Sequence, residues 1–555
     1  MDYLKLITNK QSELSQMFDR MDRDAAMFHS KPYCMLGVDG KKIDKAYHIT
    51  LLDAAQFLDK AVARITAVSR QVLVESTRLP GEKTSAIENF INDLQFEIDA
   101  RLAAKGEADT FTQHTELVCA RGPIVEQNLL RVENGQLIPD SRPIDSRWFT
   151  YELTEGRMIW GCVETLRTAA DIEAEFGYRI TGTTGSVLDF WNDNHETIFV
   201  DGHQVDERPN GYGYPPFVVA FPATSSALKD PDYYLRLGDS IMHSLRTADG
   251  HYLFDEKNFI ASNLKTLSSK SIAPDLQFPS PADGDYQALP QEYPAGTGVM
   301  LQTKDPIQLI PRPDVANSTL RYAEIIQEQI DRGSFSAMDY GTVSLPLSAV
   351  AIARLMTGRE ELMLPRLNTL AALCQSSSKM KIRQFQRFGE KLDLGEEGHR
   401  RTYSPVDLDG EYVIKYRFFT SSQEQMAGAA AICNALGDHV SEEYKQEQVL
   451  RLQDPAGERA QIAIEQAAKA DPIIALENQM RGFIKAQEAS DDKETKDWND
   501  LLARTILERI ISIMKQRKAS ESQPMAVNLE QNALDKPSAI QAVPVFGGGR
   551  GVGQS

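Results

Sequence analysis

The sequence predicts an α+β fold in which helical regions flank a β-rich region. In the first 110 residues, and again after about residue 230, apolar residues recur at three- and four-residue steps, which is the spacing of one helix face. From about residue 115 to residue 223, short apolar runs alternate with turn signals such as Asp201-Gly202, as they do in β-hairpins. A chain of 555 residues has room for roughly three to four domain-sized units.

Helices are predicted for the N-terminal part. Apolar residues from Leu52 to Val72 follow a helical spacing, and a second such segment begins after Pro80-Gly81 and ends at Gly106. In the β-rich part, the predicted strands include residues 117–119, 148–153, 158–163 and 217–221. One short helix is expected among these strands, from Thr168 to Phe176, with Gly177 ending it.

A long helix is predicted to follow the β-rich part. It starts at about Asp230, with Pro231 in its first turn, and continues to Leu267, interrupted only by Gly238 and Gly250. Residues 271–313 are rich in Pro and Gly, and strand-like pieces occur at 298–302 and 307–310. A second helix is expected from about Val315 to Asp331.

A moving loop is predicted at residues 333–345, because Gly333 and Gly341 frame bulky residues in a long connection; an ordinary surface connection is the alternative. A further long helix is expected from Pro346 to about Phe388, and Pro365 should kink or divide it. The remaining predictions are a strand at 412–419, polar helices to about residue 518 with breaks near 455–457 and at 472, and a disordered tail.

Composition excludes several classes of protein. The net charge of −19 is unlike that of typical nucleic-acid readers, so a DNA partner would not be held by an overall positive surface. The five cysteines form no C-x-x-C pair, which favours reduced thiols over a zinc site or a disulfide framework. The first residues lack the apolar stretch of a signal peptide, and the apolar run from Val343 to Ala353 is too short for a membrane helix. We therefore expect the chain to be made and kept in the cytoplasm.

The catalytic motifs that a chain of this length often carries are not found. The stretch Gly37–Lys42 has the wrong spacing for a phosphate-binding loop, and the glycine-rich run 547–553 lacks a preceding strand and a following helix. His195-Glu196 has no second histidine four residues later, and no Gly-x-Ser-x-Gly stretch occurs. The sequence therefore predicts no catalytic, cofactor-binding or metal-binding residues, and no enzyme.

The order of parts resembles that of the portal proteins of tailed bacteriophages. The run Gly213–Val219 is similar to the strand that closes the family's wing region, and Leu345–Ile352 is similar to the opening of the helix after its tunnel loop, with Ala349 where glycine is usual. The segment from Ser441 to Glu465, with Asp454-Pro455 and later glutamates, resembles the family's acidic stretch. The resemblance covers roughly residues 40 to 480, mainly as organisation.

The resemblance implies a portal-type fold, with a β-rich wing, long stem helices, a small α/β clip, a kinked long helix and a helical C-terminal crown. The corresponding parts are an N-terminal helical part of the wing (1–110), the β-rich wing (111–229), a stem helix (230–270), the clip (271–313), a second stem helix (314–332), the tunnel loop (333–345), the kinked long helix with a return to the wing (346–419), the crown (420–518) and the tail (519–555).

It also implies a function. Portal proteins form rings, normally dodecamers, at one capsid vertex, where double-stranded DNA passes during packaging and ejection. The implied partners are further copies of the chain, DNA held without sequence specificity, the terminase motor, capsid or scaffold proteins, and head-tail adaptors that dock at the clip. No membrane and no cofactor are implied, and the expected location is the virion, after assembly in the host cytoplasm.

The resemblance points to two sets of residues that face DNA. The tunnel-loop candidates are Phe335, Met338, Tyr340, Val343 and Leu345. Lys379, Arg383 and Arg387 recur every four residues on one helix face, with Lys381 beside them, and are candidates for contacts with the DNA backbone or between subunits. A solvated helix face is the alternative for this second set.

Two other functions remain open. One is a different phage structural, adaptor or scaffold protein built on a coiled coil, although the helices do not keep a strict heptad. The other is a hydrolase with an unrecognised site, which predicts a deep pocket with perturbed carboxylates. A portal protein predicts a large interface between subunits instead.

Overall fold

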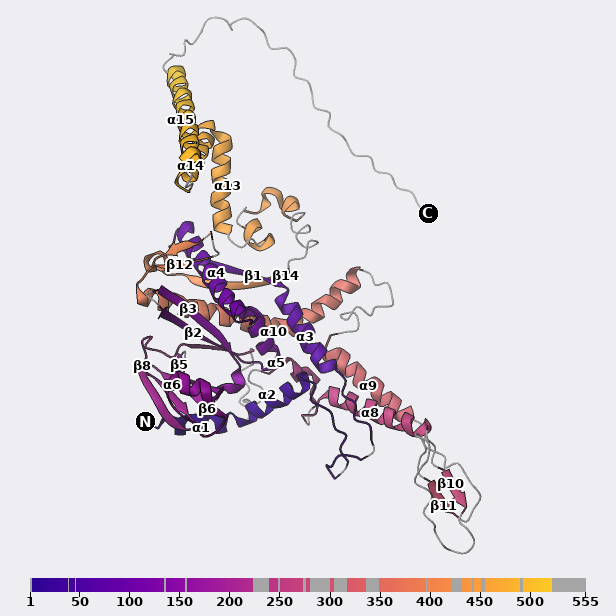
Figure 1. Ribbon diagram of the computed structural model, residues 1–555. Coiled ribbons are helices and arrows are strands. Elements are labelled where there is room, and N and C mark those ends of the chain that lie inside the picture. Colours follow the sequence, from indigo (N-terminus) through magenta and orange to yellow (C-terminus); the bar gives the residue numbers. More distant parts are fainter. Residues whose placement is uncertain are drawn as a thin grey trace, which may run out of the picture. The chain divides into compact units, whose positions relative to one another are not determined.

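The computed structural model has an α+β fold and divides into two compact units, Met1–Gly457 and Glu458–Ser555 (Figure 1). The structure describes residues 2–37, 39–44, 46–133, 136–154, 157–222, 239–247, 250–272, 276–279, 300–303, 317–335, 349–395, 398, 400–420, 432–441, 444–450, 455–489 and 493–521.

The N-terminal part is helical, as predicted, but one strand interrupts it. The helices are α1 (Tyr3–Glu13), α2 (Ser15–Phe28), α3 (Asp53–Thr66), α4 (Gly81–Ala104) and α5 (Thr110–Ala120). The predicted helix from Leu52 to Val72 is wrong in its last five residues, because β1 (Val68–Glu75) pairs antiparallel with β14 (Val413–Thr420). The predicted strand at 117–119 is also wrong: these residues belong to α5, which Asp109 caps by accepting a hydrogen bond from the Thr112 backbone.

Two antiparallel sheets make up the β-rich part, as the turn signals predicted. Their strands are β2 (Ile124–Glu133), β3 (Gln136–Ile144), β4 (Phe149–Thr154), β5 (Arg157–Thr168), β6 (Thr184–Asn192), β7 (His195–Val200), β8 (His203–Pro209) and β9 (Phe217–Ala220). The sheet orders are β3-β2-β9 and β4-β5-β6-β7-β8. The predicted short helix is α6 (Ala169–Phe176). Thr168 caps it, and it ends at Gly177, whose φ of 66° is left-handed.

The long helix expected from Asp230 to Leu267 is not continuous in its described part, and residues 230–238 lie outside the described residues. Ser240 caps a short 3-10 helix, η2 (Ile241–Leu245), and a turn follows in which the Gly250 backbone donates to the Thr247 carbonyl. Gly250 has a φ of 80°, which few residues other than glycine adopt, so the helix cannot run through it. The helix α8 therefore extends only from Leu253 to Ile272.

A second helix runs beside α8, as predicted for residues 314–332. This helix, α9 (Asn317–Gly333), packs along α8, and Figure 1 shows the two side by side. Between them in sequence, β10 (Leu276–Pro279) and β11 (Met300–Thr303) form a parallel pair. β11 overlaps one of the two predicted strands, and the other, at 307–310, lies outside the described residues.

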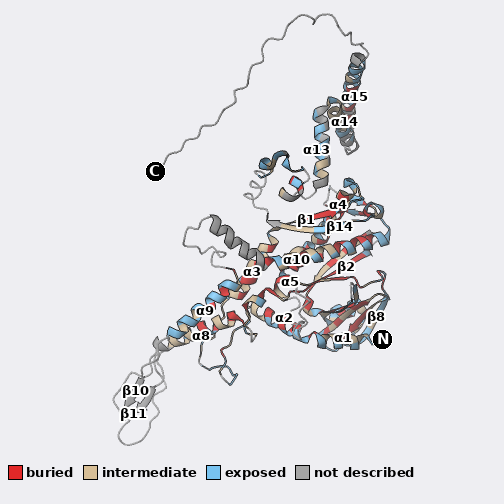
Figure 2. Ribbon diagram, turned by 180° about the vertical axis from the view of Figure 1, so that it is seen from behind, coloured by how far each residue is buried: buried red, intermediate tan, exposed pale blue. Residues whose placement is uncertain are grey.

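The helix α10 (Ala349–Phe388) is the longest in the first unit and continues through Pro365 without being divided. Its predicted first residue, Pro346, lies outside the described residues. Leu370 and Leu373 belong to a core cluster shared with α3, α5 and α8, and Ile382 and Phe385 belong to a second cluster shared with α4 and β14. Figure 2 shows buried residues along α10 and on β2. The chain then forms β12 (Leu392–Leu394), β13 (Arg401–Tyr403) and the short helix η4 (Pro405–Leu408).

The described part of the second unit is helical. The predicted break at Pro472 is confirmed, but residues 455–457 are helical, and residues 451–454 just before them lie outside the described residues. The helices α13 (Pro455–Ala470) and α14 (Pro472–Ala489) each begin at a proline, which suits the first helical turn. The third helix, α15 (Lys493–Glu521), packs against α14, and Arg517 near its end pairs with Asp471 before α14 at 2.8 Å. The tail that was predicted to be disordered lies outside the described residues beyond Glu521.

Glu196 on β7 gives a first testable prediction. Burial, and then the nearby Asp189 on β6, raise the pKa of Glu196 from 4.5 to about 7. A carboxyl whose pKa is higher in the folded than in the unfolded state stabilises the fold at low pH, and this contribution is lost as the pH rises through the folded pKa. Glu196→Gln should therefore unfold at a higher temperature than the wild type at about pH 8, with the difference vanishing at about pH 4.

Thermal unfolding followed by circular dichroism at both pH values measures this effect. Glu207→Gln on β8, where the carboxylate is more exposed, is the matched control and should give the same small difference at both pH values. Equal stability of Glu196→Gln and wild type at the higher pH would contradict the prediction.

Candidate functional surfaces

The four basic residues predicted to share one function on α10 have different surroundings. Lys381 is buried, and its Nζ pairs with Glu126 Oε1 on β2 at 3.0 Å. The prediction that Lys381 contacts DNA or another subunit is therefore wrong, because its charge is paired with Glu126 inside the core. Lys379 and Arg383, two residues to either side, are exposed.

The buried ion pair belongs to a polar network between α10 and β2. Burial alone would raise the pKa of Glu126, but the positive charge of Lys381 holds that pKa below its usual value. Ser377 donates to Asn128 Oδ1 at 3.2 Å, and Gln384 donates to the Asn128 carbonyl at 2.8 Å. Groups that would be costly to bury alone thus satisfy one another and fix α10 along β2.

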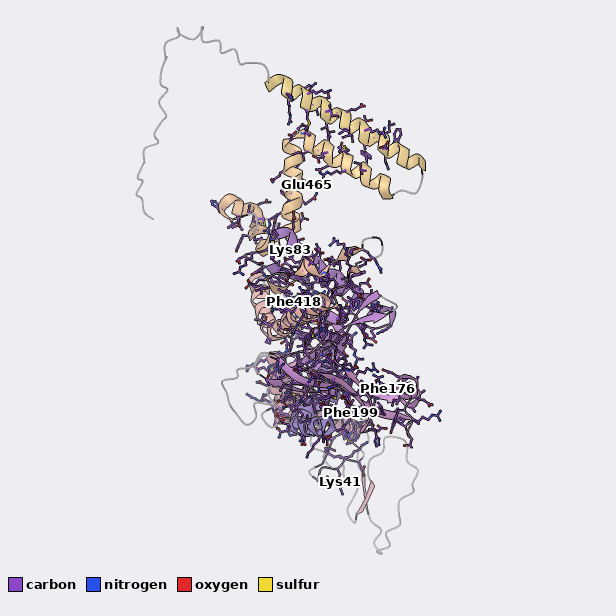
Figure 3. The ribbon with its side chains drawn as sticks, turned by 90° about the vertical axis from the view of Figure 1, so that its left-hand side faces the viewer. Lys41, Lys83, Phe176, Phe199, Phe418 and Glu465 are labelled. Carbon is purple, nitrogen blue, oxygen red and sulfur yellow. The ribbon has the colours of Figure 1, made fainter. Side chains whose placement is uncertain are left out.

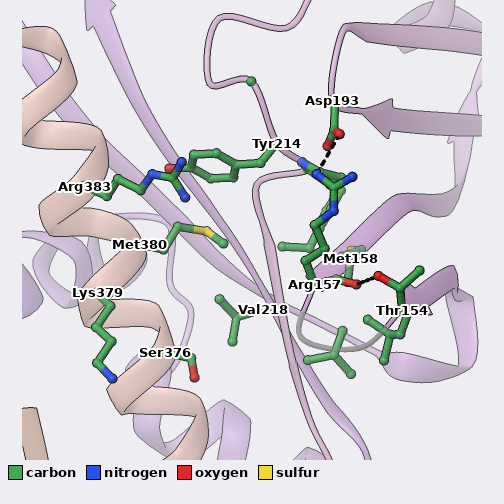
Figure 4. Close-up of a pocket in the computed structure, with 15 residues that line it drawn as sticks. Thr154, Arg157, Met158, Asp193, Tyr214, Val218, Ser376, Lys379, Met380 and Arg383 are labelled. Atoms are coloured by element: carbon green, nitrogen blue, oxygen red, sulfur yellow. Dashed lines mark hydrogen bonds and ion pairs between the residues drawn. The ribbon is translucent and has the colours of Figure 1, made fainter.

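Lys379 and Arg383 line an open cavity of about 690 Å³ (Figure 4). The Arg383 guanidinium carbon lies 4.5 Å from the centre of the Tyr214 ring, and Arg157 on the opposite wall pairs with Asp193 at 3.1 Å. The apolar lining comes from residues that include Met158, Phe217, Val218 and Met380. Cations above an apolar surface can hold a segment that carries both an apolar and an acidic side chain.

The fourth basic residue, Arg387, has a structural partner. Its guanidinium donates to the Tyr212 carbonyl next to Gly213, which has a φ of 69°. A Cβ on Gly213 would lie 3.1 Å from the guanidinium, so this close approach suits glycine. Arg387 thus holds the turn that leads into the strand β9.

The cavity lacks the features that a hydrolase predicts. Asp193 is the one carboxylate among the described residues that line it, and it is paired with Arg157. Burial raises the pKa of Asp189 and of Glu196, but neither residue lines this cavity.

The first residues of the predicted tunnel loop are packed against the core. Phe335 is 2% exposed, its ring lies 5.4 Å from that of Phe57, and the Arg64 guanidinium carbon lies 4.5 Å above it. A DNA-facing role for Phe335 is therefore wrong for this structure. A Cβ on Gly333 would lie 2.6 Å from the Ser244 carbonyl oxygen, so that glycine allows α9 to pack against η2. Met338, Tyr340, Val343 and Leu345 lie outside the described residues.

An extended segment along α8 was not predicted from the sequence. In this segment, residues 46–52, which we call the strap, the backbone N–H groups of Tyr47, Ile49 and Leu51 donate to side chains of α8. The acceptors are Thr266 Oγ1 at 3.0 Å, Ser262 Oγ at 2.9 Å and Asn258 Oδ1 at 2.8 Å. The detectable signal was the spacing of these three short polar residues by four along one helix face.

A buried charged cluster joins α8 to α2 and α10. The two carboxylates of the cluster are Asp24 and Asp239. Arg20 and Arg246 each pair with Asp239 at 3.0 Å, while the Tyr252 hydroxyl donates to Asp24 at 2.6 Å. From α10, the Arg366 guanidinium donates to the Ser240 carbonyl at 2.9 Å. The residue before α8 is therefore tied to α2 through Asp24, and the chain around η2 is tied to both α2 and α10.

The comparisons with known proteins leave the family open. In the part of the chain that the structure describes, no helix has the length and apolar character needed to cross a membrane. Nor does any group of three or more His, Cys, Asp or Glu side chains among the described residues have an arrangement that suits a metal ion. No family model matches the chain, and no curated protein matches it.

The buried Lys381–Glu126 pair gives a second prediction. Lys381→Met leaves Glu126 charged and without its partner in the core, so we expect it to lower the free energy of unfolding by about 3–5 kcal/mol. The double variant Lys381→Met/Glu126→Leu removes both charges and should recover part of this loss. Lys379→Met, on the exposed side of the same helix turn, is the matched control and should change stability by less than about 0.5 kcal/mol.

Equilibrium unfolding in urea measures all three variants. If Lys381→Met and Lys379→Met lose the same stability, the ion pair does not anchor α10.

Proposed function

We propose that the chain is a portal protein: a ring-forming structural channel for double-stranded DNA at one vertex of a phage capsid. The observation that carries the proposal is the α8–α9 hairpin, whose two helices expose apolar side chains. Phe259 on α8 is 39% exposed, and Leu320 and Ile325 on α9 are each 48% exposed. Apolar groups gathered on one element in this way are typical of surfaces that a partner covers.

A ring of identical copies gives these helices their partners. Each hairpin would then pack against the hairpins of its two neighbours, as the staves of a barrel do, and the copies would surround a channel. The parallel pair β10–β11 supports the same arrangement, because a two-stranded sheet leaves outer edges that a neighbouring copy or an adaptor could pair with. The portal-type assignment of wing, stem, clip and crown follows from this order of parts.

The charge of the chain suits a channel through which DNA slides. At −19 per copy, a ring presents phosphate with a surface that is repulsive on average, so contacts with DNA are weak and independent of sequence. The proposed partners are the terminase motor, capsid or scaffold proteins and head-tail adaptors, and the proposed location is the virion. The cavity beside Lys379 and Arg383 is a candidate for one of these protein contacts.

Electron microscopy of the purified protein tests this proposal. We expect rings with an axial hole and, by mass photometry, a mass close to twelve times that of the 62.0 kDa chain. Leu320→Glu and Ile325→Glu place charges in the proposed contact and should each reduce the ring fraction, whereas Leu166→Glu, at a 66% exposed position on β5, should leave it unchanged. A chain that remains a closed monomer at all concentrations, with no lumen in any assembly, would overturn the proposal.

A further inference from the structure

A β-hairpin near the N-terminus stands out from the packed part of the first unit. In this segment, residues 35–43, which we call the N-terminal hairpin, Leu36 bridges to Lys42, and the Ile43 backbone donates to the Met35 carbonyl at 3.0 Å. Its tip carries Lys41, which Figure 3 places at the margin of the packed side chains. Beyond Met35, the described residues of the hairpin are exposed or partly exposed.

One face of this hairpin combines an apolar and a cationic side chain. Leu36 is 56% exposed, and its bridge partner Lys42 is exposed as well. Side chains of directly opposed residues in an antiparallel pair lie on the same face and close together. The hairpin therefore presents leucine and lysine side by side to whatever lies next to it.

The strap holds the base of the hairpin in place. Three hydrogen bonds join the strap to α8. The strap also binds the base of the hairpin: the Tyr33 backbone donates to Thr50 Oγ1 at 2.8 Å, and the Met35 backbone donates to His48 Nδ1 at 3.1 Å. Because these contacts fix the base, the face with Leu36 and Lys42 has a defined direction.

A groove of complementary character lies between α8 and α9. This α8–α9 groove has a volume of about 600 Å³, and its apolar floor is formed by Leu51, Ile260, Leu264, Ala323 and Ile326. Its acidic lining residues are Glu324, Glu328 and Asp331 on α9. The one cation in the lining, Lys257, is paired with Asp53 at 2.9 Å. The groove is thus apolar inside and acidic along one side.

We propose that the N-terminal hairpin of one copy docks in the α8–α9 groove of the next copy. Leu36 enters the apolar floor, and Lys42 faces the acidic side at Glu324 and Asp331. The charges are complementary, lysine against glutamate and aspartate, in a chain whose net charge is −19. None of the described residues of a copy's own hairpin lines its groove, so each copy offers a hairpin to one neighbour and a groove to the other.

This contact depends on the proposed ring, and it specifies which surfaces of neighbouring copies meet. A hairpin and a groove are different surfaces, so their contact is heterologous: it continues from copy to copy and ends only when the ring closes. An isologous contact, in which the same patch meets itself, would stop at a dimer.

Disulfide trapping tests the contact directly. A chain carrying Leu36→Cys and Ala323→Cys, with Cys34 and Cys433 replaced by Ser, is oxidised after assembly and resolved on a denaturing gel. We expect a ladder of covalent multimers from the double variant, only dimers from an equal mixture of the two single variants, and no ladder from the background chain. Dimers alone from the double variant would show an isologous contact and overturn the proposal.

Charge reversal tests the chemistry of the contact. Lys42→Glu and Glu324→Lys should each lower the ring fraction by about tenfold or more at equal concentration, and the two together should restore it. Leu36→Asp should act like Lys42→Glu, whereas Val406→Asp, at a 72% exposed position on η4, is the control and should assemble normally. Unchanged melting temperatures show that the variants still fold.

The outcomes separate this inference from the proposed function. Wild-type rings that give no ladder, and that tolerate Leu36→Asp and Lys42→Glu, overturn the docking contact and leave the portal proposal standing. A wild-type chain that stays monomeric overturns both.

Discussion

The structure of the first unit depends on how α10 satisfies the charges that it carries into the core. Lys381 meets Glu126 on β2, and Arg366, four turns earlier, meets the Ser240 carbonyl beside η2. Between these anchors, Leu370 and Leu373 supply apolar contacts that are not directional. The apolar contacts would allow the helix to slide or rotate, but a buried charge without its partner is too costly to permit either. The two anchors therefore set α10 against the β-rich part at one end and against the start of η2 at the other.

The start of α8 connects the helices proposed to form the subunit contacts to the rest of the chain. Asp24 on α2 binds Tyr252 just before this helix, Arg20 on α2 pairs with Asp239 beside η2, and the strap runs along the helix. A hairpin of two helices that exposes apolar groups is useful for assembly only if its direction is defined before it meets a neighbour, because flexible partners lose entropy on association. Within one chain, the buried charges and the strap fix the direction of this hairpin.

Helix ends that are marked by local turn residues could be predicted from the sequence. Elements and buried side chains whose partners lie far along the chain were missed. The helix α4 begins directly after Pro80, and α6 ends at Gly177, as their turn signals indicated. The strand β1 was missed because its pairing partner, β14, lies far along the chain. On α10, the spacing of the basic residues gave no means of telling Lys381, which faces β2, from its exposed neighbours. The buried position of Phe335 likewise follows from α3, which local patterns could not bring next to it.

The strap has a consequence for how long such an arrangement can be. Two residues of extended chain advance by about 6.6 Å, and four residues of helix advance by about 6.0 Å. Successive rungs therefore drift apart by about 0.6 Å, and after a few of them the donors and acceptors lie beyond hydrogen-bonding distance. The three bonds at Thr266, Ser262 and Asn258 keep ordinary lengths of 3.0, 2.9 and 2.8 Å, so the mismatch is still tolerated over this span. The difference in rise between the strap and the helix therefore limits the length over which the strap can follow α8. Beyond that length the strap must leave the helix.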